Sequence, residues 1–403
     1  MFRPIGSLIG EPVVWAVAIG IFEAKEGILS YLKVTIHKRI NKRKEALMAR
    51  LQEATKNSFE GQDFFIGIDV HKKRWIVTIR TEGLNLKTYS MDPRPEILYH
   101  YMNRHYPGGR FHTVYEAGFC GFWIHRRLTE MGFRSMVVNP ADIPTRQRER
   151  ERKRDAVDSR KLARELEHGS LEPIFVPSLE QDAFRSVSRL YQEIVRGGVR
   201  IKQQIKAYLH YHGIVIPSVD EMSHWSGRFV HWLWEQEFSQ GHHRYTWERM
   251  LERLTRNRKE RLDILRQMRK MARGNQTIRY IRTVSGIGFI TSFTYYAEVM
   301  DIRRFRNGDQ FASYVGIAPS LSSSADTERV RGLTQRHNKY LRKLIIESAW
   351  VAIKKDPALT LAYVRYTKRM PKKKAIIRIA RKLLDRIRYV WLNERPYTMM
   401  PIE

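Results

Sequence analysis

Apolar runs separated by short polar turns characterise residues 64–138. The runs 64–70 and 75–80 are rich in aromatic and β-branched residues, and the polar turn His71-Lys72-Lys73 separates them, which is typical of a β-hairpin. The patterns that follow predict, in order, a helix, a strand, a helix and a strand at 95–106, 112–116, 123–131 and 135–138. Strands that alternate with helices predict an α/β domain.

Helical spacing of apolar residues dominates the rest of the chain. The pattern from Asp155 fits a helix that ends near Gly169. Two longer amphipathic patterns at 179–212 and 247–273 predict a helical, coiled-coil-like middle region. Beyond them, Val284-Ser285-Gly286-Ile287-Gly288 predicts a turn like that of a helix-hairpin-helix motif, and an ordinary helix-helix turn is the alternative. The predicted fold class is α/β followed by α.

The first 60 residues are interpreted as a separate helical extension. Their apolar run 12–22 is flanked by Glu11 and Glu23 and is shorter than the roughly 20 apolar residues that span a bilayer. Only Arg3 supplies a charge for a signal peptide, so a secretion signal is not expected. A poorly ordered extension fits the same residues, and no membrane partner is expected in either case.

These patterns divide the chain into five predicted regions. They are an N-terminal extension, an α/β domain, a helical linker, a C-terminal helical domain and a basic C-terminal helix, at 1–60, 61–177, 178–273, 274–360 and 361–403. Between Arg365 and Arg388 the last region has eleven Lys or Arg and one acidic residue, interleaved with apolar residues. We expect this helix to pack its apolar face on the protein and present cations to nucleic acid, and a solvated surface helix is the alternative.

The chain is strongly basic. Its 403 residues include 73 Lys and Arg against 42 Asp and Glu, which gives a formal net charge of +31. The excess is distributed along the whole chain, which favours a polyanion such as double-stranded DNA as the partner and makes a membrane surface the weaker alternative. Cys120 is the only cysteine, which excludes an internal disulfide framework and a CxxC zinc site and favours a reducing cytoplasm.

Four carboxylates have the placement expected of a metal site. Asp69 lies inside an apolar strand, where an uncompensated charge would cost several kcal/mol. Glu116 ends a second strand, and Asp155 and Asp158 lie on one face of a predicted helix. Such oxygen ligands suit Mg²⁺ or Mn²⁺, which catalyse phosphoryl transfer. Taken singly, each carboxylate also fits a role as a turn residue, a cap or the partner of a neighbouring cation.

A serine-rich segment is the second candidate for chemistry. Ser320-Leu321-Ser322-Ser323-Ser324-Ala325 precedes Arg329 and Arg331, and we expect it to form a basic loop. A serine hydroxyl can attack phosphorus when a base or metal ion takes its proton, and neighbouring cations offset the charge that develops on the phosphoryl oxygens. A serine-rich surface loop without catalysis is the alternative.

The first candidate site resembles the DEDD transposases of insertion sequences. The similar motifs are Gly67-Ile68-Asp69-Val70-His71-Lys72, Tyr115-Glu116-Ala117-Gly118 and Asp155-Ala156-Val157-Asp158-Ser159-Arg160-Lys161-Leu162-Ala163. This chain differs from the family in having Arg154 before the third carboxylate and Ser159 after the fourth. The resemblance implies a RuvC-like domain of the ribonuclease H type, in which Asp69, Glu116, Asp155 and Asp158 bind Mg²⁺ or Mn²⁺.

The second candidate site resembles the serine domain of the same family. The similar segments are Val284-Ser285-Gly286-Ile287-Gly288 and Phe311-Ala312-Ser313-Tyr314-Val315-Gly316-Ile317-Ala318-Pro319. The family places a nucleophilic serine in a Ser-Ser-Gly loop, and alignment on Pro319 and Gly332 puts Ser323 and Ser324 at these serines. Ala325 replaces the glycine, which leaves the register open by one residue.

The resemblance also implies partners. Members of this prokaryotic family act as oligomers, so a homo-oligomer, either a dimer or a tetramer, is expected in a cytoplasmic, DNA-associated setting. They are guided by a structured bridge RNA from their own element, which implies a guide RNA as a second nucleic-acid partner. The cations expected to contact nucleic acid are Lys72, Lys73, Arg160, Lys161, Arg329, Arg331, Arg336 and Arg342.

These observations together predict a DNA transposase or recombinase. In this hypothesis Ser324, or Ser323, attacks a DNA phosphate with the help of metal and forms a phosphoserine intermediate. One rival is a metal-dependent RuvC-like junction nuclease that forms no covalent intermediate, and a protein–DNA adduct separates it from the recombinase. The other rival is a non-catalytic nucleic-acid-binding remnant, which would bind with steep salt dependence and cleave nothing.

Overall fold

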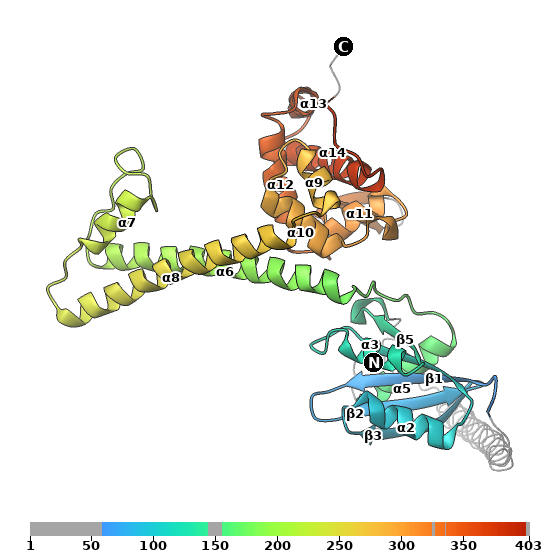
Figure 1. The fold of residues 1–403 in the computed structure, drawn as a ribbon. Helices are drawn as coiled ribbons and strands as arrows, with labels where there is room; N and C mark the ends of the chain where they lie inside the picture. Colours follow the sequence, from blue (N-terminus) through green and yellow to red (C-terminus); the bar gives the residue numbers. More distant parts are fainter. Residues whose placement is uncertain (1–58, 144–154, 325–326, 335, 400–403) are drawn as a thin grey trace, which may run out of the picture. The chain divides into compact units, whose positions relative to one another are not determined.

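The computed structural model describes residues 59–143, 155–324, 327–334 and 336–399 and divides the chain into two compact units, Met1–Val176 and Pro177–Glu403 (Figure 1). The predicted N-terminal extension lies outside the described residues except for its last two positions. The predicted regions 178–273, 274–360 and 361–403 all fall within the second unit.

The first unit is built on a five-stranded mixed sheet. Its strands are β1 (Asp63–Val70), β2 (Trp75–Thr81), β3 (Leu84–Met91), β4 (Arg110–Glu116) and β5 (Arg134–Val138), in the sheet order β3-β2-β1-β4-β5. β1 pairs antiparallel with β2 and parallel with β4, and β5 continues the parallel part. Its helices are α2 (Pro95–His105), α3 (Trp123–Glu130), the short 3-10 helix η2 (Pro140–Asp142) and α5 (Asp155–Glu167).

Successive side chains of each strand point to opposite faces of this sheet. One face carries Ile68 of β1, which packs in one core with Leu98 of α2 and Leu128 of α3. The opposite face carries Val114 of β4, which packs with Leu162 of α5. Because helices cover both faces, the central strands are apolar along most of their length, which is the pattern the sequence shows.

The apolar pattern of the sequence predicts no strand at β3. Half of its residues are polar and all but one are at least partly exposed, because β3 is an edge strand of the sheet. The local signal for this strand is the dipeptide Glu82-Gly83, whose φ angles of 49° and 77° form the tight turn after β2. Arg80 supports that turn, since its Nη2 donates a hydrogen bond to the Gly83 carbonyl oxygen at 3.0 Å.

Within its described residues, the second unit is helical apart from the hairpin of β6 and β7. Its elements are α6 (Leu179–Tyr211), α7 (Gly227–Trp234), α8 (Gly241–Met271), α9 (Gln276–Thr283), α10 (Phe289–Val299), η3 (Ile302–Arg304), α11 (Gly308–Val315), β6 (Pro319–Ser324), β7 (Thr327–Leu333), α12 (Leu341–Ala352), α13 (Pro357–Thr367) and α14 (Lys372–Leu392). The predicted class, α/β followed by α, is confirmed.

Helices α6 and α8 form a long antiparallel pair (Figure 1). Phe184 near the start of α6 packs with Met268 near the end of α8, whereas Leu209 near the end of α6 packs with Trp247 near the start of α8. The predicted start of the second helix at Trp247 is wrong, because α8 begins at Gly241. The six preceding residues are mostly exposed and therefore lack the apolar spacing on which the prediction depends.

Helices α9 to α14 enclose a core that includes Ile281, Phe311, Ile345 and Leu383. α14 is the basic C-terminal helix, and it buries nine residues in this unit, including Leu383. The Gly-Ile-Gly turn joins α9 to α10 and packs against α12. A Cβ atom at Gly286 would lie only 2.6 Å from the carbonyl oxygen of a residue in α12, so this turn requires glycine for packing.

Candidate active site

Asp69 and Glu116 lie at one end of the sheet in the first unit. β1 and β4 run parallel, and their register pairs Gly67 with Val114. Asp69 and Glu116 each follow two residues later, so they lie on neighbouring strands and on the same face as Gly67 and Val114. Two of the predicted carboxylates are therefore brought together by the strand register.

Helix α5 lies across this face and runs antiparallel to β1. Near its start, the Ser159 Oγ lies 2.9 Å from the Thr78 Oγ1, and Thr78 is the partner of Gly67 in the sheet. Near its end, the Arg80 Nε donates a hydrogen bond to the Glu167 Oε2 at 2.8 Å. α5 therefore begins at the end of the sheet where Asp69 of β1 lies.

The helix brings Asp155 and Asp158 toward the same end. Asp155 lies four residues before Ser159, which is about 6 Å along a helix. Asp69 lies two residues beyond Gly67, which is about 6.6 Å along a strand. The backbone of Asp155 thus reaches the level of Asp69. The Asp158 side chain is partly buried, and the Asp155 side chain lies outside the described residues.

Gly67 sets the close approach of α5 to β1. A Cβ atom at this position would lie 2.1 Å from the Ser159 carbonyl oxygen and 2.5 Å from the Ala163 backbone nitrogen. Both atoms belong to the backbone of α5, so a larger residue would displace the helix. The glycine next to Ile68-Asp69 therefore has a packing role that positions the third and fourth carboxylates.

The four predicted ligands have the type of donor atom that a hard divalent cation prefers. All four predicted ligands are carboxylates, which Mg²⁺ and Mn²⁺ prefer. The Asp69 Oδ2 lies 3.1 Å from the His71 Nε2, and the second carboxylate oxygen leaves Asp69 able to bind a metal ion while it keeps this contact. Among the side chains that the structure describes, no three His, Cys, Asp or Glu residues are grouped as metal ligands.

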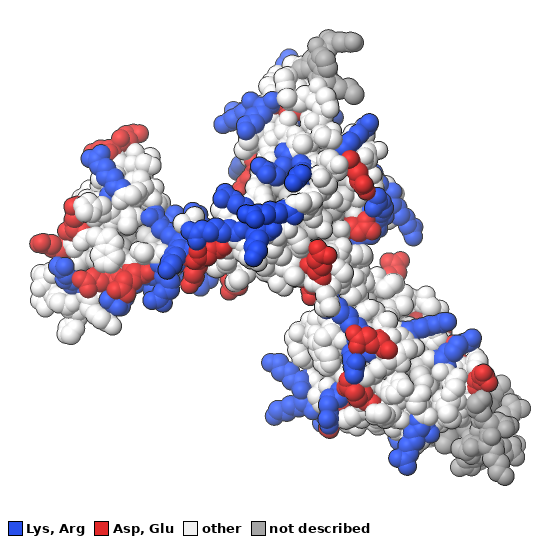
Figure 2. All heavy atoms as spheres, in the orientation of Figure 1, with Lys and Arg blue, Asp and Glu red and all other residues white. Residues whose placement is uncertain are grey.

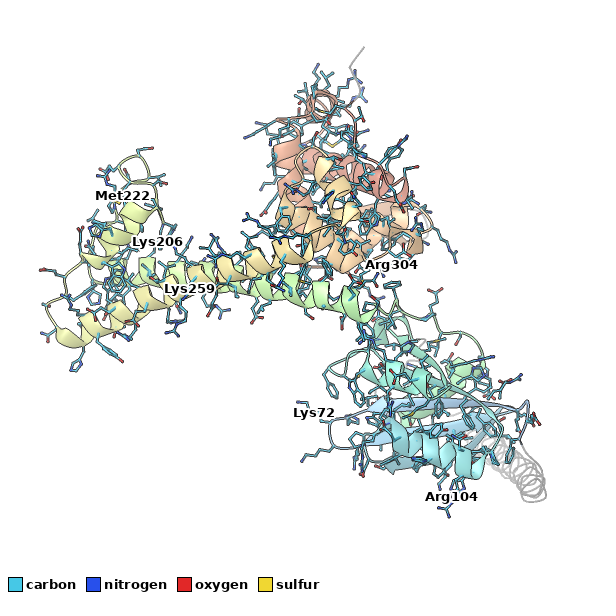
Figure 3. All side chains as sticks on the ribbon, in the orientation of Figure 1. Lys72, Arg104, Lys206, Met222, Lys259 and Arg304 are labelled. Carbon is cyan, nitrogen blue, oxygen red and sulfur yellow. The ribbon has the colours of Figure 1, made fainter. Side chains whose placement is uncertain are left out.

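Cations and an aromatic ring lie next to the carboxylate end of the sheet. Lys72, which is labelled in Figure 3, lies in the turn that follows β1, and both Lys72 and Lys73 are exposed. The Lys72 Nζ lies 5.9 Å from the centroid of the Phe119 ring, and Phe119 is 65% exposed. Sequence reasoning does not single out Phe119, because an exposed aromatic residue in a loop has no periodic signal.

The two predicted cations of α5 follow Ser159 directly. Arg160 is exposed and donates a hydrogen bond from its Nε to the Thr88 Oγ1 of β3 at 3.2 Å. Lys161 is partly buried. These residues lie on the helix that carries Asp155 and Asp158, whereas Lys72 and Lys73 follow the strand that carries Asp69.

The serine segment forms a strand, and the predicted loop is wrong. β6 pairs antiparallel with β7, and the register sets Ser322 opposite Arg329, Ser323 opposite Glu328 and Ser324 opposite Thr327. Ser324 is the last residue of β6, and residues 325–326 lie outside the described residues. The strand has only one large apolar residue, Leu321, so pairing with β7 rather than an apolar pattern defines it. The side chains of 319–331, including Ser323, Ser324, Arg329 and Arg331, are not described.

Arg342 supports the segment that follows the hairpin. Its Nη2 donates a hydrogen bond to the Thr334 carbonyl oxygen. Gly316 leaves room for this guanidinium, since a Cβ atom there would lie 2.6 Å from the Arg342 Nη2. Burial lowers the pKa of Arg342. Arg336, in the same segment, has an exposed side chain.

A buried carboxylate anchors the same segment to the helices. Glu298 is 1% exposed and accepts two hydrogen bonds from Arg189, at 2.7 and 2.9 Å. The Asn338 Nδ2 donates to the Glu298 Oε2 at 2.9 Å, and the Tyr314 hydroxyl donates to the Glu298 carbonyl oxygen at 2.9 Å. This network joins α6, α10 and α11 to the residues between β7 and α12. Sequence reasoning misses it because its members are widely separated in the chain.

Positive charge is spread over the visible face of the second unit. Figure 2 shows Lys and Arg side chains along the paired helices α6 and α8 and over the C-terminal helices.

No helix among the described residues combines the length and apolar character needed to cross a membrane.

Both candidate sites fall within segments that match transposase family models. Residues 66–213 match the model described as Transposase and named for the DEDD transposases of IS110. Residues 278–365 match the model described as Transposase IS116/IS110/IS902 family. The chain therefore belongs to the IS110/IS116 family of transposases. The family that the sequence motifs predict, a transposase of insertion sequences with a DEDD domain, is confirmed.

Similar proteins carry transposase names. The y4qE protein of Sinorhizobium fredii is 28% identical over 238 residues, which cover 59% of this chain and 57% of y4qE. The match thus spans little more than half the length of that relative. The y4rJ protein of the same organism is 26% identical over 364 residues, which cover 79% of this chain and 89% of y4rJ. The transposase for insertion sequence element IS1111A of Coxiella burnetii is 22% identical over 59% of this chain and 64% of its own length.

Proposed function

We propose that this member of the IS110/IS116 transposase family cleaves and rejoins DNA strands at the ends of its insertion sequence through a serine nucleophile. Ser324 is the proposed nucleophile, and Ser323 is its alternative because Ala325 leaves the register open by one residue. The Oγ–P bond forms, the bond from phosphorus to one sugar oxygen breaks, and the hydroxyl proton passes to that oxygen. The products are a phosphoserine link and a free sugar hydroxyl.

The carboxylate end of the sheet is proposed as the metal centre. Asp69, Glu116, Asp155 and Asp158 would hold Mg²⁺ or Mn²⁺, which would stabilise negative charge on the phosphoryl oxygens when bound. The observation that carries this proposal is the path of α5, which lies on the face of Asp69 and Glu116 and begins at their end of the sheet.

The partners are proposed on the grounds of charge and family. Double-stranded DNA would bind through phosphate contacts with the predicted cations, including Lys72 and Lys73 beside the carboxylates. A structured guide RNA and assembly into a homodimer or tetramer complete the proposal. The net charge of +31 is large enough for a chain that binds two nucleic acids.

Substitution of Asp69 by Asn, or of Glu116 by Gln, tests the metal centre. Each change should abolish cleavage of the element's own ends while DNA affinity is retained or increased, because a ligand and a negative charge are removed but no phosphate contact is lost. Cleavage is read on gels with metal and guide RNA present, and affinity by fluorescence anisotropy.

Asp92→Asn is the matched control for these two variants. Asp92 lies in the same unit, and both it and its partner Arg94 are 66% exposed. This control should cleave as the unchanged chain does. Full cleavage by Asp69→Asn would disprove the carboxylate centre.

A further inference from the structure

A cavity of about 680 Å³ lies in the second unit between the base of the serine hairpin and helices α13 and α14. Its volume falls within the roughly 300–1,000 Å³ of sites that hold small organic ligands. The residues that line it are Ile317, Gly332, Leu333, Tyr366, Met370, Lys373, Lys374, Ile377, Arg378, Arg381 and Lys382. All of them belong to the described part of the chain.

The lining combines an apolar floor with a cationic rim. Leu333, Tyr366 and Met370 are partly buried and supply apolar surface, including one aromatic ring. Lys373 and Lys374 are exposed at the start of α14. A ligand that fills this cavity must therefore offer both an apolar or aromatic surface and negative charge.

The cations of the rim differ in whether a carboxylate already neutralises them. The Arg381 Nη2 lies 2.7 Å from the Asp309 Oδ1, so Arg381 is neutralised within the protein. No carboxylate among the described residues forms an ion pair with Lys373, Lys374 or Arg378. The Arg378 guanidinium lies 5.6 Å from the centroid of the Tyr366 ring, which gives the cavity two planar groups on which a flat ring can stack.

We propose that this cavity binds an unpaired nucleotide of the DNA strand that the serine hairpin engages. The base would stack on Tyr366 and Arg378, and the adjoining phosphates would contact Lys373 and Lys374. A duplex cannot enter in this way, because the faces of its bases are covered by their neighbours in the stack. The carboxylates of an acidic peptide would use the cations but lack the flat ring that stacks on Tyr366 and Arg378.

The position of the cavity selects DNA as the nucleic acid. Leu333 lines the cavity and pairs with Pro319 at the base of the hairpin, while Ser324 ends β6 five residues later. Five residues of strand span about 16 Å, so a strand held at Ser324 reaches the cavity within a few nucleotides. The choice of DNA thus rests on the proposed function of the hairpin.

Photo-crosslinking of the full chain locates the nucleotide. The probe is a single-stranded DNA oligonucleotide that carries 5-iodo-deoxyuridine, which joins to aromatic and sulfur-containing side chains in contact with the base. The chain carries alanine at Ser322, Ser323 and Ser324, so no covalent chemistry at serine contributes. We expect the crosslinked peptide to contain Tyr366 or Met370 and to disappear with excess unlabelled single strand.

Salt dependence tests the phosphate contacts. Single-strand affinity falls with salt by a slope of about 0.7 for each phosphate contact, so Lys373→Gln/Lys374→Gln should lower the slope by about 1.4. The matched control Lys354→Gln/Lys355→Gln removes the same charge from exposed positions outside the cavity and outside the basic C-terminal helix, and it should leave the slope unchanged.

Three outcomes would overturn the proposal. They are the absence of a crosslink between residues 357 and 382, equal slopes for the two double variants, and a crosslink that forms with the matching RNA in preference to DNA. Failure of the serine mechanism is distinguishable, because both Ser323 and Ser324 would then be unmodified in cleavage reactions while the crosslink remains. A missing crosslink beside an intact serine adduct would reject the cavity alone.

Discussion

Gly67 illustrates how a single residue positions the candidate metal centre. The absent side chain lets the backbone of α5 lie against β1 at the level where Ser159 meets Thr78. The sequence predicts the four carboxylates and the strand and helix that carry them, but not this contact. A contact between residues 92 positions apart in sequence depends on tertiary packing, for which periodicity gives no signal.

Substitution of Gly67 by Ala should therefore impair both stability and cleavage. The new Cβ atom would clash with backbone atoms of Ser159 and Ala163, and relief requires α5 to move. We expect a loss of about 1–3 kcal/mol in the free energy of unfolding, together with strongly reduced cleavage. Denaturant unfolding and cleavage of the element's ends measure the two effects.

Gly118→Ala is the control for this prediction. A Cβ atom at Gly118 would lie 4.0 Å from its nearest neighbour, which is ordinary contact. This variant should unfold at the same denaturant concentration as the unchanged chain. Equal stability of the Gly67 and Gly118 variants would show that α5 does not need the close approach.

Glu298 shows the same limit of sequence reasoning at the second candidate site. Its ion pair with Arg189 spans 109 positions, and nothing in either local sequence indicates it. Replacement of Glu298 by Ala should cost about 3 kcal/mol, at the lower end of the range for a broken buried pair, because the Arg189 side chain is 42% exposed and can regain water. The free energy of unfolding of the second unit measures this loss.

Glu347→Ala provides the comparison for Glu298. Glu347 forms an exposed ion pair with Lys343 at 3.6 Å on α12, so its removal should change stability by less than about 0.5 kcal/mol. A similar small effect for Glu298→Ala would contradict the anchoring role of the network.

At the level of elements, apolar periodicity predicts the buried strands and most helices. β1, β2, β4 and β5 and helices α2, α3, α5 and α6 lie within a few residues of their predicted positions. Three strands that the sequence does not predict are β3, β6 and β7. None has an apolar run like those of the buried strands, so hydrogen bonding with a neighbouring strand defines them rather than burial of one face.

The change from loop to strand alters the interpretation of the serine site. A hairpin fixes Ser322, Ser323 and Ser324 in the ladder opposite Arg329, Glu328 and Thr327, respectively. Of the three, Ser324 is the last residue of β6. A regular ladder holds the nucleophile in position more firmly than a loop, which suits a residue that must align with phosphorus.

At the level of the whole molecule, charge and the order of motifs are the properties that the sequence predicts best. The four carboxylates occur in one unit and the serine hairpin in the other, and the family matches cover both. The cavity beside the hairpin is not predictable from sequence, because its lining comes from three segments between Ile317 and Lys382 that are brought together only by folding.

The most direct test of the serine mechanism is a search for a covalent protein–DNA link. The full chain is incubated with the element's own ends, metal and guide RNA, and the trapped complex is digested and analysed by mass spectrometry. We predict a phosphorylated peptide between Ser320 and Arg329, and its loss when Ser324, or Ser323, is replaced by alanine. Cleavage to free 5′ and 3′ ends that continues when Ser322, Ser323 and Ser324 are all alanine would contradict the mechanism and establish a metal-dependent nuclease.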